Sequence, residues 1–411
     1  MINEQDHQKW TQALRDQDCN TVAVTVYARQ GIWNSDNIWW NEEEPSVEAE
    51  IRAAKAQGLK VVLVVRTLLD HYFEENEGYW HGMIMPANDS LLASWFEHYG
   101  LFLNKWGKVA EELEVDVLAI GSELKQLVST MAVDSIPELE RWYLDETSQR
   151  HHHDQYLDHY KEFKAASEII GSESSRGDFS NKLSHESRRL AEWAAEVSGN
   201  ENLAFINQRR KLLDAHWRKL IGETRHNFSG ALTYAANFDN YQSLSFWDEL
   251  DVMGVNAYFG LRRADEPLGI EVLCKGWGSV FEEMNRYQEK MALDKPVLFT
   301  ELGYTTKQGC TITPWQGFGH SLIVGDGVDS LIIWRQQVED LEERAMALRA
   351  LLQVAQADAD HRLQGILYWK LTSDASLLTY EPFGVHIGCE SSDPASALFP
   401  DFLDIAPFVP R

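Results

Sequence analysis

The sequence predicts a (β/α)8 TIM-type barrel, an α/β fold in which parallel strands alternate with helices. Short runs rich in Val, Ile and Leu, typical of buried parallel strands, recur along most of the 411 residues. Helical patterns separate these runs, and strand–helix–strand units repeated over this length close a parallel sheet into a barrel. Barrels of this size form one unit, so residues 1–411 are expected to be a single catalytic domain.

Seven strands are predicted, each from an apolar run. They are Thr21–Tyr27, Leu59–Arg66, Val115–Ile120, Ala231–Tyr234, Val252–Tyr258, Pro296–Thr300 and Gln364–Trp369. The helical patterns include Gln8–Asp16, Val47–Gln57, Leu91–Leu113 and Val338–Ala357. Gly58 follows the second of these patterns and is expected to end it.

The missing eighth strand is the first one of the barrel. The predicted helix Gln8–Asp16 leads directly into a strand, whereas a complete barrel would have another strand before that helix. Three explanations remain open: the barrel is incomplete, another segment substitutes for the strand, or the start codon is wrongly placed.

A long polar stretch with helical patterns separates the third predicted strand from the fourth. Only its last part, from about Leu212, is needed as the helix before the next strand, so residues 131–212 are expected to be a helical insertion. It follows the carboxyl end of a strand, on the side where barrels place their sites, and would act as a lid, a cleft wall or a dimer contact. His151–His153 lie in it, but consecutive histidines on a helix diverge, so no metal site is expected.

The composition narrows the class of ligand. The formal charge is −27, which argues against nucleic acid and against anionic membrane surfaces. The chain has 15 Trp, 14 Tyr and 17 Phe, and aromatic faces suit sugar rings, although such rings also fill cores. The sequence gives no indication of oligomeric state.

Sequence signals for secretion, membrane spans, metal sites and nucleotide binding are absent. The amino-terminal residues are polar, no apolar run is long enough for a membrane span, and the four cysteines form no C-x-x-C pair. A cytoplasmic protein without a metal site is therefore expected. No phosphate-binding loop, dinucleotide fingerprint or serine-hydrolase elbow occurs, so no nucleotide cofactor is expected.

Two strand regions end in glutamate, at Glu123 and at Glu301. They are far apart in the sequence, but the carboxyl ends of barrel strands share one face, so the two side chains are expected to meet. Glycoside hydrolysis needs two such carboxyl groups, one as an acid and one as a nucleophile or base. The alternative is that each glutamate anchors a loop or binds a metal.

At these residues the chain resembles the clan-A glycoside hydrolases, and most closely the family-113 β-mannanases. The segments that carry the resemblance are Ile51–Leu63, Gly121–Lys125, Trp217–Asp239, Phe246–Leu261, Lys295–Thr306 and Gly365–Lys370. The resemblance implies that Glu123 is the general acid/base and Glu301 the nucleophile of a retaining enzyme, with carboxyl groups ~5–5.5 Å apart. It also implies a raised pKa for the acid and an ionised nucleophile, and it implies no cofactor.

The resemblance assigns further residues to the sugar cleft. Tyr258 would donate a hydrogen bond to Glu301, and Trp369 would stack on the sugar beside the scissile bond. Asn237 and Asn256 would bind sugar hydroxyls. Tyr258 and Trp369, taken without the resemblance, fit a core position equally well.

The chain departs from the family at several cleft positions. Arg66 stands where the family has a histidine, and it either holds Glu301 ionised or forms a structural ion pair. Asn256 replaces an aspartate, and in the loop of Trp80 the next residue, His81, replaces an arginine. Trp80 itself is either a sugar platform or a packed loop anchor.

These features predict a retaining hydrolase of β-linked mannose-containing oligo- or polysaccharides that acts by double displacement. Because the departures lie where sugars would be read, a retaining β-glycosidase for a glucoside or galactoside remains an alternative. A catalytically silent barrel that binds glycans or a protein partner is the alternative outside enzymes. The missing strand supports it, whereas the intact pair of glutamates argues against it.

Overall fold

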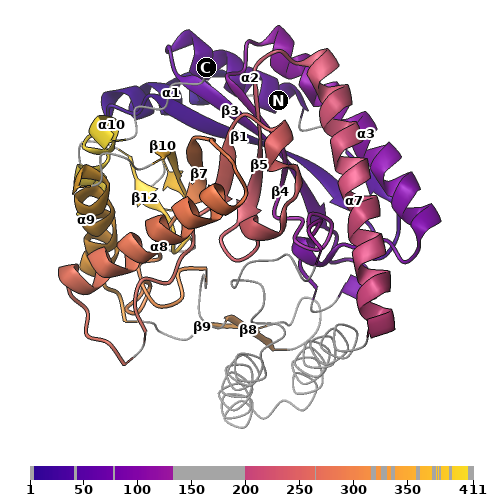
Figure 1. Ribbon diagram of the computed structural model, residues 1–411. Coiled ribbons are helices and arrows are strands. Elements are labelled where there is room, and N and C mark those ends of the chain that lie inside the picture. Colours follow the sequence, from indigo (N-terminus) through magenta and orange to yellow (C-terminus); the bar gives the residue numbers. More distant parts are fainter. Residues whose placement is uncertain are drawn as a thin grey trace.

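The computed structural model describes residues 4–40, 44–76, 79–132, 200–263, 265–315, 321–324, 331–334, 338–357, 362–372, 376, 378, 381–387 and 391–405. Its central feature is a curled sheet with helices on its outer side (Figure 1). The strands are β1 (Thr21–Gln30), β2 (Ile38–Trp39), β3 (Lys60–Leu69), β4 (Val117–Ser122), β5 (Ala231–Asn237), β6 (Met253–Asn256), β7 (Val297–Leu302), β8 (Ser321–Val324), β9 (Leu331–Trp334), β10 (Leu363–Tyr368), β11 (Leu371–Thr372) and β12 (Val385–His386).

The α-helices are α1 (Glu4–Asp16), α2 (Glu44–Ala56), α3 (Asp89–Glu112), α7 (Asn200–Asn227), α8 (Ile270–Lys290), α9 (Leu341–Ala357) and α10 (Phe402–Ile405). Short 3-10 helices are η1 (Glu74–Asn76), η2 (His81–Met83), η4 (Tyr241–Ser243), η5 (Phe246–Glu249) and η8 (Ser396–Leu398). None of the helices in the described ranges is both long and apolar enough to cross a membrane.

All seven predicted strands are present, and they lie in one sheet in the order β10-β7-β6-β5-β4-β3-β1, with β2 added antiparallel to β1. The neighbours among the seven are parallel. Strand β1 runs three residues past its predicted end at Tyr27. Its last residue, Gln30, is fully buried. The side-chain amide is satisfied there, because its oxygen accepts a hydrogen bond from Trp95 at 2.8 Å and its nitrogen donates one to the Ile32 carbonyl.

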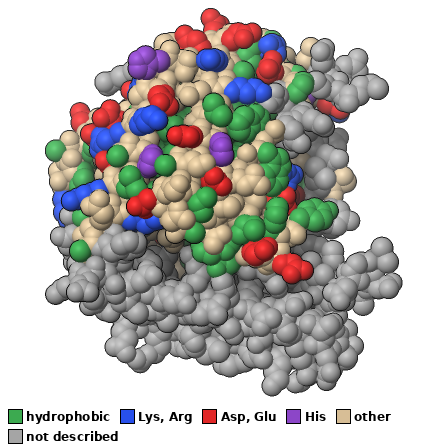
Figure 2. All heavy atoms as spheres, turned by 90° about the vertical axis from the view of Figure 1, so that its right-hand side faces the viewer, with side chains coloured by type: hydrophobic (Ala, Val, Ile, Leu, Met, Phe, Trp, Pro, Cys, Tyr) green, Lys and Arg blue, Asp and Glu red, His purple; other side chains and the backbone are tan. Residues whose placement is uncertain are grey.

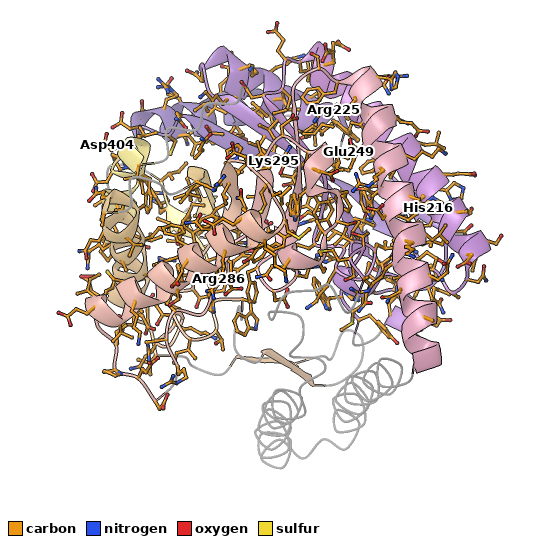
Figure 3. All side chains as sticks on the ribbon, in the orientation of Figure 1. His216, Arg225, Glu249, Arg286, Lys295 and Asp404 are labelled. Carbon is orange, nitrogen blue, oxygen red and sulfur yellow. The ribbon has the colours of Figure 1, made fainter. Side chains whose placement is uncertain are left out.

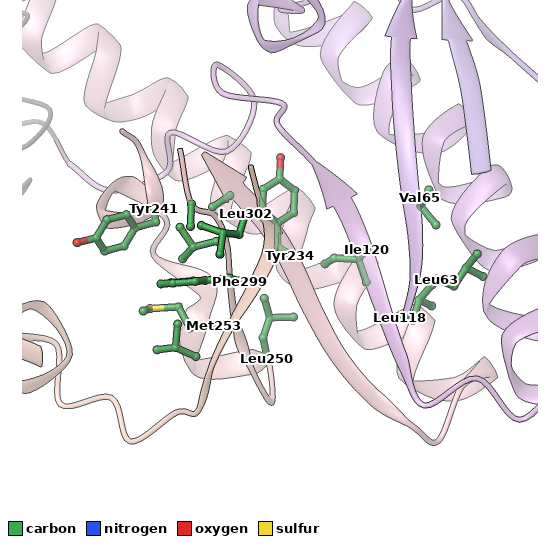
Figure 4. Packing of buried hydrophobic residues seen from close by; sticks show 14 of the residues in the cluster. Leu63, Val65, Leu118, Ile120, Tyr234, Tyr241, Leu250, Met253, Phe299 and Leu302 are labelled. Carbon is green, nitrogen blue, oxygen red and sulfur yellow. The ribbon is translucent and has the colours of Figure 1, made fainter. Parts of the chain in front are cut away.

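Branched and small side chains fill the inside of the curled sheet. They come from β3, β4, β5, β7 and β10 and from the residue just before β6, and they form one buried cluster: Val62, Val64, Val117, Ala119, Ala231, Val252, Leu298 and Leu367. Alternate residues of the same strands point outward to the helices, for example Leu63 and Val65 of β3 (Figure 4). Because both faces are covered, these strands are apolar along their whole length, which is why they could be recognised in the sequence.

Helix α3 shows how the outer layer is specified. Asn88 caps its amino terminus by accepting a hydrogen bond from the Leu91 amide at 3.0 Å. Trp95, Tyr99 and Trp106 lie on one helix face at helical spacing and are fully buried, with Tyr99 donating to the Ile120 carbonyl of β4. The large aromatic content of the chain is therefore in good part core, as one of the two readings of the composition allows.

The sheet is open between β10 and β1 in the described part of the chain. Strand β2 pairs with β1 only at Arg29 and Gln30, and a cavity of about 310 Å³ lies beside the rest of β1. Its lining includes Ala23 and Thr25, which align with inward-facing β3 residues and stay partly exposed. This is the position of the first barrel strand that the sequence lacks, and none of the described residues forms a strand there.

The expected insertion, residues 131–212, falls largely outside the described residues. Its expected carboxyl boundary at Leu212 lies inside a helix, because α7 already begins at Asn200. Two arginines hold this early part of α7 to the catalytic-side loops. Arg209 donates to Asp89 at 3.1 Å, and Arg210 donates to the Met131 carbonyl at 2.7 Å.

Charged side chains cover the outside and close the end at which the strands begin. Acidic and basic groups are interspersed on the face that carries α3 and α7 (Figure 2). At the starts of β5 to β7, Arg225, Glu249 and Lys295 lie near one another (Figure 3). Lys295 donates to the Leu250 carbonyl at 2.6 Å, and Arg225 to Asp251 at 2.5 Å. Contacts at this end stabilise a barrel, and the site of a barrel lies at the opposite end.

A buried carboxylate ties together the loops on that opposite end. Glu343, in the first turn of α9, pairs with Arg262 at 3.1 Å and accepts hydrogen bonds from the amides of Gly309 and Thr311 at 2.7 and 3.1 Å. Burial opposes its ionisation, but the hydrogen bonds from Thr311 and Gly309 outweigh burial and lower its pKa. Its contribution to stability is therefore present at neutral pH and lost as the pH falls through this lowered pKa.

Glu343→Ala is expected to lower the free energy of unfolding by about 3–5 kcal/mol at pH 7, because it leaves the Arg262 charge buried without its partner. Urea unfolding measures the effect. The matched control is Glu342→Ala, since Glu342 is the preceding residue but its 2.9 Å pair with Arg349 is exposed and should contribute at most about 1 kcal/mol. Equal losses in the two variants would contradict the assigned role of Glu343.

Candidate active site

The sheet brings the two predicted glutamates to the same end of the barrel. Glu301 is in β7, aligned with Asn256 at the end of β6, and Asn256 is aligned with Asn237 at the end of β5. Glu123 directly follows β4, and its amide donates to the Ala235 carbonyl of β5 at 3.0 Å. Parallel strands thus place all four side chains at their carboxyl ends.

One arginine lies between the two carboxylates. The Nη2 atom of Arg66, on β3, contacts Oε2 of Glu123 at 3.1 Å and also donates to Oε1 of Glu301. Ser122 accepts from the same guanidinium at 3.0 Å, which fixes its orientation. Because one nitrogen atom reaches both carboxylates, their nearest oxygens lie within two hydrogen-bond lengths, roughly 6 Å.

Glu123 has an unusual backbone conformation. Its φ is 57°, in the left-handed region that residues with a Cβ seldom adopt, at a cost of roughly 1–3 kcal/mol. The neighbouring contacts hold it there: its amide bonds to β5, and the next amide, of Leu124, donates to the buried Tyr234 hydroxyl at 2.8 Å. Such strain turns the Glu123 side chain toward Arg66 and is typical of functional sites.

A second cation-capable group contacts Glu123. Nε2 of His81, in η2, lies 2.9 Å from Oε2 of Glu123. The loop is tied to the segment after Glu123 by a hydrogen bond from the Gln126 amide to the Gly82 carbonyl. The ring of Trp80 lies directly over Gly82, where a Cβ would be only 2.2 Å from the ring, so a larger residue there would displace Trp80. Trp80, half-buried, also makes an edge-to-face contact with His81.

Two aromatic residues complete the surroundings of Arg66 and Glu301. The Tyr258 hydroxyl donates to Oε2 of Glu301 at 2.6 Å, as the resemblance implies. Burial and then the Glu301 charge raise the pKa of Tyr258, so its proton stays in place to donate. Trp369, just after β10, has its ring 5.6 Å from the guanidinium carbon of Arg66 and remains half-exposed.

The two asparagines differ in their surroundings. Oδ1 of Asn256 accepts a hydrogen bond from Thr300 at 2.8 Å, whereas its buried Nδ2 has no hydrogen-bond partner within the described part of the chain. That nitrogen lies close enough to Glu123 to lower the pKa of its carboxyl. Asn237 is buried beside Asn256, and no contact ties its side chain to either glutamate among the described residues.

The pKa values of the two carboxyls are separated in the direction opposite to that implied by the resemblance. Burial raises the pKa of Glu301 to about 7, because Arg66 offsets burial only in part and the charge of Glu123 adds to it. Burial also opposes ionisation of Glu123, but Arg66 and then His81 outweigh it and lower its pKa to about 2. The difference arises because Glu123 faces two positively charged neighbours when His81 is protonated.

Several of these residues were not singled out from the sequence as site residues. His81 was noted only as a departure within the Trp80 loop and Tyr27 only as a strand end, and Ser122 was not named. Tyr27 lies beside Arg66 on the paired strand β1 and influences its pKa. Its inward-facing position at the end of a strand was the signal that could have identified it. The contact of His81 depends on how its loop folds back, which no local pattern predicts.

The described residues contain no group of three or more His, Cys, Asp or Glu side chains arranged to hold a metal ion. Cys19, Cys274 and Cys310 are unpaired thiols, and Cys389 and His151–His153 lie outside the described residues.

Comparisons with known proteins identify the fold and the family of this chain. The chain is similar to the GH113 β-mannanase of Alicyclobacillus acidocaldarius in complex with ManMIm, with 16% identity over 97% of this chain and 91% of that chain and a TM-score of 0.59. A second solved structure, a GH113 β-1,4-mannanase, has 16% identity over 97% and 93% of the two chains and a TM-score of 0.59. These two likenesses show the fold. No curated protein sequence matches. The model of Glycoside Hydrolase Family 113 matches residues 2–132 and 204–322, more than half of the chain, so this chain belongs to that family and is a glycoside hydrolase.

Proposed function

We propose that this glycoside hydrolase cleaves β-linked mannose-containing oligo- or polysaccharides with retention of anomeric configuration. Glu301 is the nucleophile and Glu123 is the general acid/base. The observation that carries the proposal is the single Arg66 nitrogen that contacts both carboxylates. Inverting enzymes separate their carboxyl groups by ~6.5–9.5 Å to admit a water molecule, and two carboxylates on one nitrogen are too close for that arrangement.

The proposed chemistry has two displacements. A Glu301 oxygen forms a bond to the anomeric carbon as the glycosidic C–O bond breaks, and the Glu123 proton passes to the leaving oxygen. Water then attacks the anomeric carbon, Glu123 takes the water proton, and the bond to Glu301 breaks. Arg66 and Tyr258 each donate to Glu301, which orients it and supports its anionic form when it leaves.

The choice of sugar rests on the family and on its solved members, which are β-mannanases. In this proposal the half-exposed Trp369 beside Arg66 stacks on the sugar at the scissile bond, and the buried Nδ2 of Asn256 donates to a sugar hydroxyl or to Glu123. Arg66, His81 and Asn256 stand where the resemblance expects other residues, so a different β-glycoside is the alternative that the same experiment decides.

The test is hydrolysis of a panel of β-manno-oligosaccharides and aryl β-mannosides, β-glucosides and β-galactosides, with the anomer of the first product read by proton NMR before it mutarotates. We expect cleavage of the mannosides to give the β-anomer first. Initial release of the α-anomer would refute the retaining mechanism. Preferential cleavage of glucosides or galactosides would refute the substrate, and cleavage of none would favour a silent glycan-binding barrel.

A further inference from the structure

The strongest unexplained feature of the site is the contact between His81 and Glu123. Nε2 of His81 and Nη2 of Arg66 approach the same Glu123 oxygen, at 2.9 and 3.1 Å. Both partners are largely buried, with 19% of the His81 side chain and 14% of the Glu123 side chain exposed. Arginine can only donate, whereas a histidine nitrogen donates or accepts according to its protonation. The role of this contact therefore depends on the state of His81.

The two carboxylates share one proton in the catalytic state, and their partners are not equivalent. Glu301 has a donor on each oxygen, Arg66 on Oε1 and Tyr258 on Oε2, so it is well suited to be ionised. Glu123 can keep the proton on Oε2 while that oxygen still accepts from Arg66, provided that Nε2 of His81 is unprotonated and accepts the Glu123 proton. An imidazolium at His81 would instead donate to Glu123 and favour its ionised form.

We propose that His81 is a positioning residue that determines which of the two glutamates holds the shared proton. Neutral His81, with its hydrogen on Nδ1, accepts from Glu123 and keeps the proton on the acid. Protonated His81 donates to Glu123, and the shared proton then resides on Glu301, where it blocks the nucleophile. The inference rests on the proposed roles of the two glutamates and concerns the regulation of that same site.

The balance of protons gives the direction of the pH effect. Protonation of His81 adds one proton to the site, and the shared proton then moves from Glu123 to Glu301, so activity falls. Burial opposes ionisation of Glu123, but Arg66 and then His81 outweigh it and lower its pKa to about 2, whereas burial raises the pKa of Glu301 to about 7, which is the inactive order. Histidine is the side-chain type that changes charge between pH 5 and 8, so the acidic limb of the activity profile should lie in that range.

Three other titratable groups beside the contact have pKa values shifted away from this range. Burial opposes the charge of Arg66, but the charges of Glu301 and Glu123 outweigh burial and raise its pKa above its usual range. Burial, first of all, raises the pKa values of Tyr258 and Tyr234, so both remain neutral. The acidic limb is thus assigned to His81 and the pair that it contacts.

His81→Gln tests this assignment, because a glutamine amide can donate or accept but carries no charge. We expect the acidic limb of the kcat/KM profile to move to lower pH by about one unit or more, the size of effect that a nearby charge has on a carboxyl. We expect kcat/KM at the optimum to fall less than about tenfold. An acidic limb that coincides with that of the wild type would overturn the proposal.

His216→Gln is the matched control. His216 lies on α7, stacked on Phe96 and away from the strand ends (Figure 3). His216→Gln is the same substitution at a histidine outside the site, so it should leave the acidic limb of the kcat/KM profile where it is. A shift of the same size in both variants would indicate a general charge effect and would also overturn the proposal.

A second measurement needs no activity. Nitrogen-15 NMR of histidine-labelled protein distinguishes the two neutral tautomers, and the His81 signal is the one missing in His81→Gln. We expect neutral His81 to carry its hydrogen on Nδ1 in the wild type. A neutral His81 with its hydrogen on Nε2 would refute the proposal. This result is independent of hydrolysis, so a wild type that cleaves no glycoside would refute only the proposed function.

Discussion

Replacing Glu301 by glutamine is expected to lower kcat by at least about 10⁴-fold for every glycoside that the wild type cleaves. The scale is that of removing the nucleophile from an enzyme that works through a covalent intermediate. Glutamine fills the same space, and its oxygen can still accept from Arg66 or Tyr258, but it cannot form a stable ester with the anomeric carbon. The measurement is kcat on the best manno-oligosaccharide and on an activated aryl glycoside, because loss of the nucleophile affects both.

The fold should survive this change. Arg66 keeps Glu123 and Ser122 as partners at 3.1 and 3.0 Å, so its charge is not left unpaired. The thermal midpoint of Glu301→Gln should therefore stay within a few degrees of the wild-type value, as expected for a change near 1 kcal/mol or less in a chain of this size. A well-folded variant with more than a hundredth of the wild-type kcat would contradict the assignment of Glu301 as the nucleophile.

The strands and the two glutamates were predictable from the sequence because each depends on local pattern. Runs such as Lys60–Leu69 are apolar on both faces since the inner side fills the barrel and the outer side meets helices, and this leaves a continuous signal. Glu123 and Glu301 stand out because a carboxylate directly after such a run is costly to bury without a role. The predicted helix Gln8–Asp16 leads directly into a strand, and the sheet of the described residues is open between β10 and β1.

What could not be predicted depends on distant chain segments meeting. The sharing of one arginine by both glutamates needs β3 to lie beside β4 and the curl of the sheet to bring β7 close. The His81 contact needs the η2 loop to fold over Glu123, and the order of the two pKa values depends on burial and Arg66 as well as on that contact. The start of α7 at Asn200 lies within the stretch that the sequence assigns to the helical insertion, because helical patterns run on both sides of Leu212 and mark no boundary there.

Replacing Glu123 by alanine is expected to have an effect that depends on the leaving group. Natural glycosidic oxygens need a proton as they depart, so kcat/KM on manno-oligosaccharides should fall by about 10²–10⁴-fold. A dinitrophenyl glycoside departs as a stable anion and needs no acid, so its kcat/KM should change little. Its kcat should still fall, because the second displacement has lost the base that activates water, and the glycosyl-enzyme should accumulate as a burst of released phenol.

Azide separates this loss of a catalytic group from a general disturbance of the site. It is a nucleophile that needs no base, so it should restore kcat of Glu123→Ala on the activated substrate and yield a glycosyl azide of retained configuration. Glu123→Gln is the companion variant, because alanine loses the side-chain contacts with Arg66 and His81, whereas glutamine keeps the shape of the side chain without a transferable proton. If both variants lost activated and natural substrates equally, and azide restored neither, Glu123 would be a residue that shapes the cleft around Arg66, and the acid would have to be sought elsewhere.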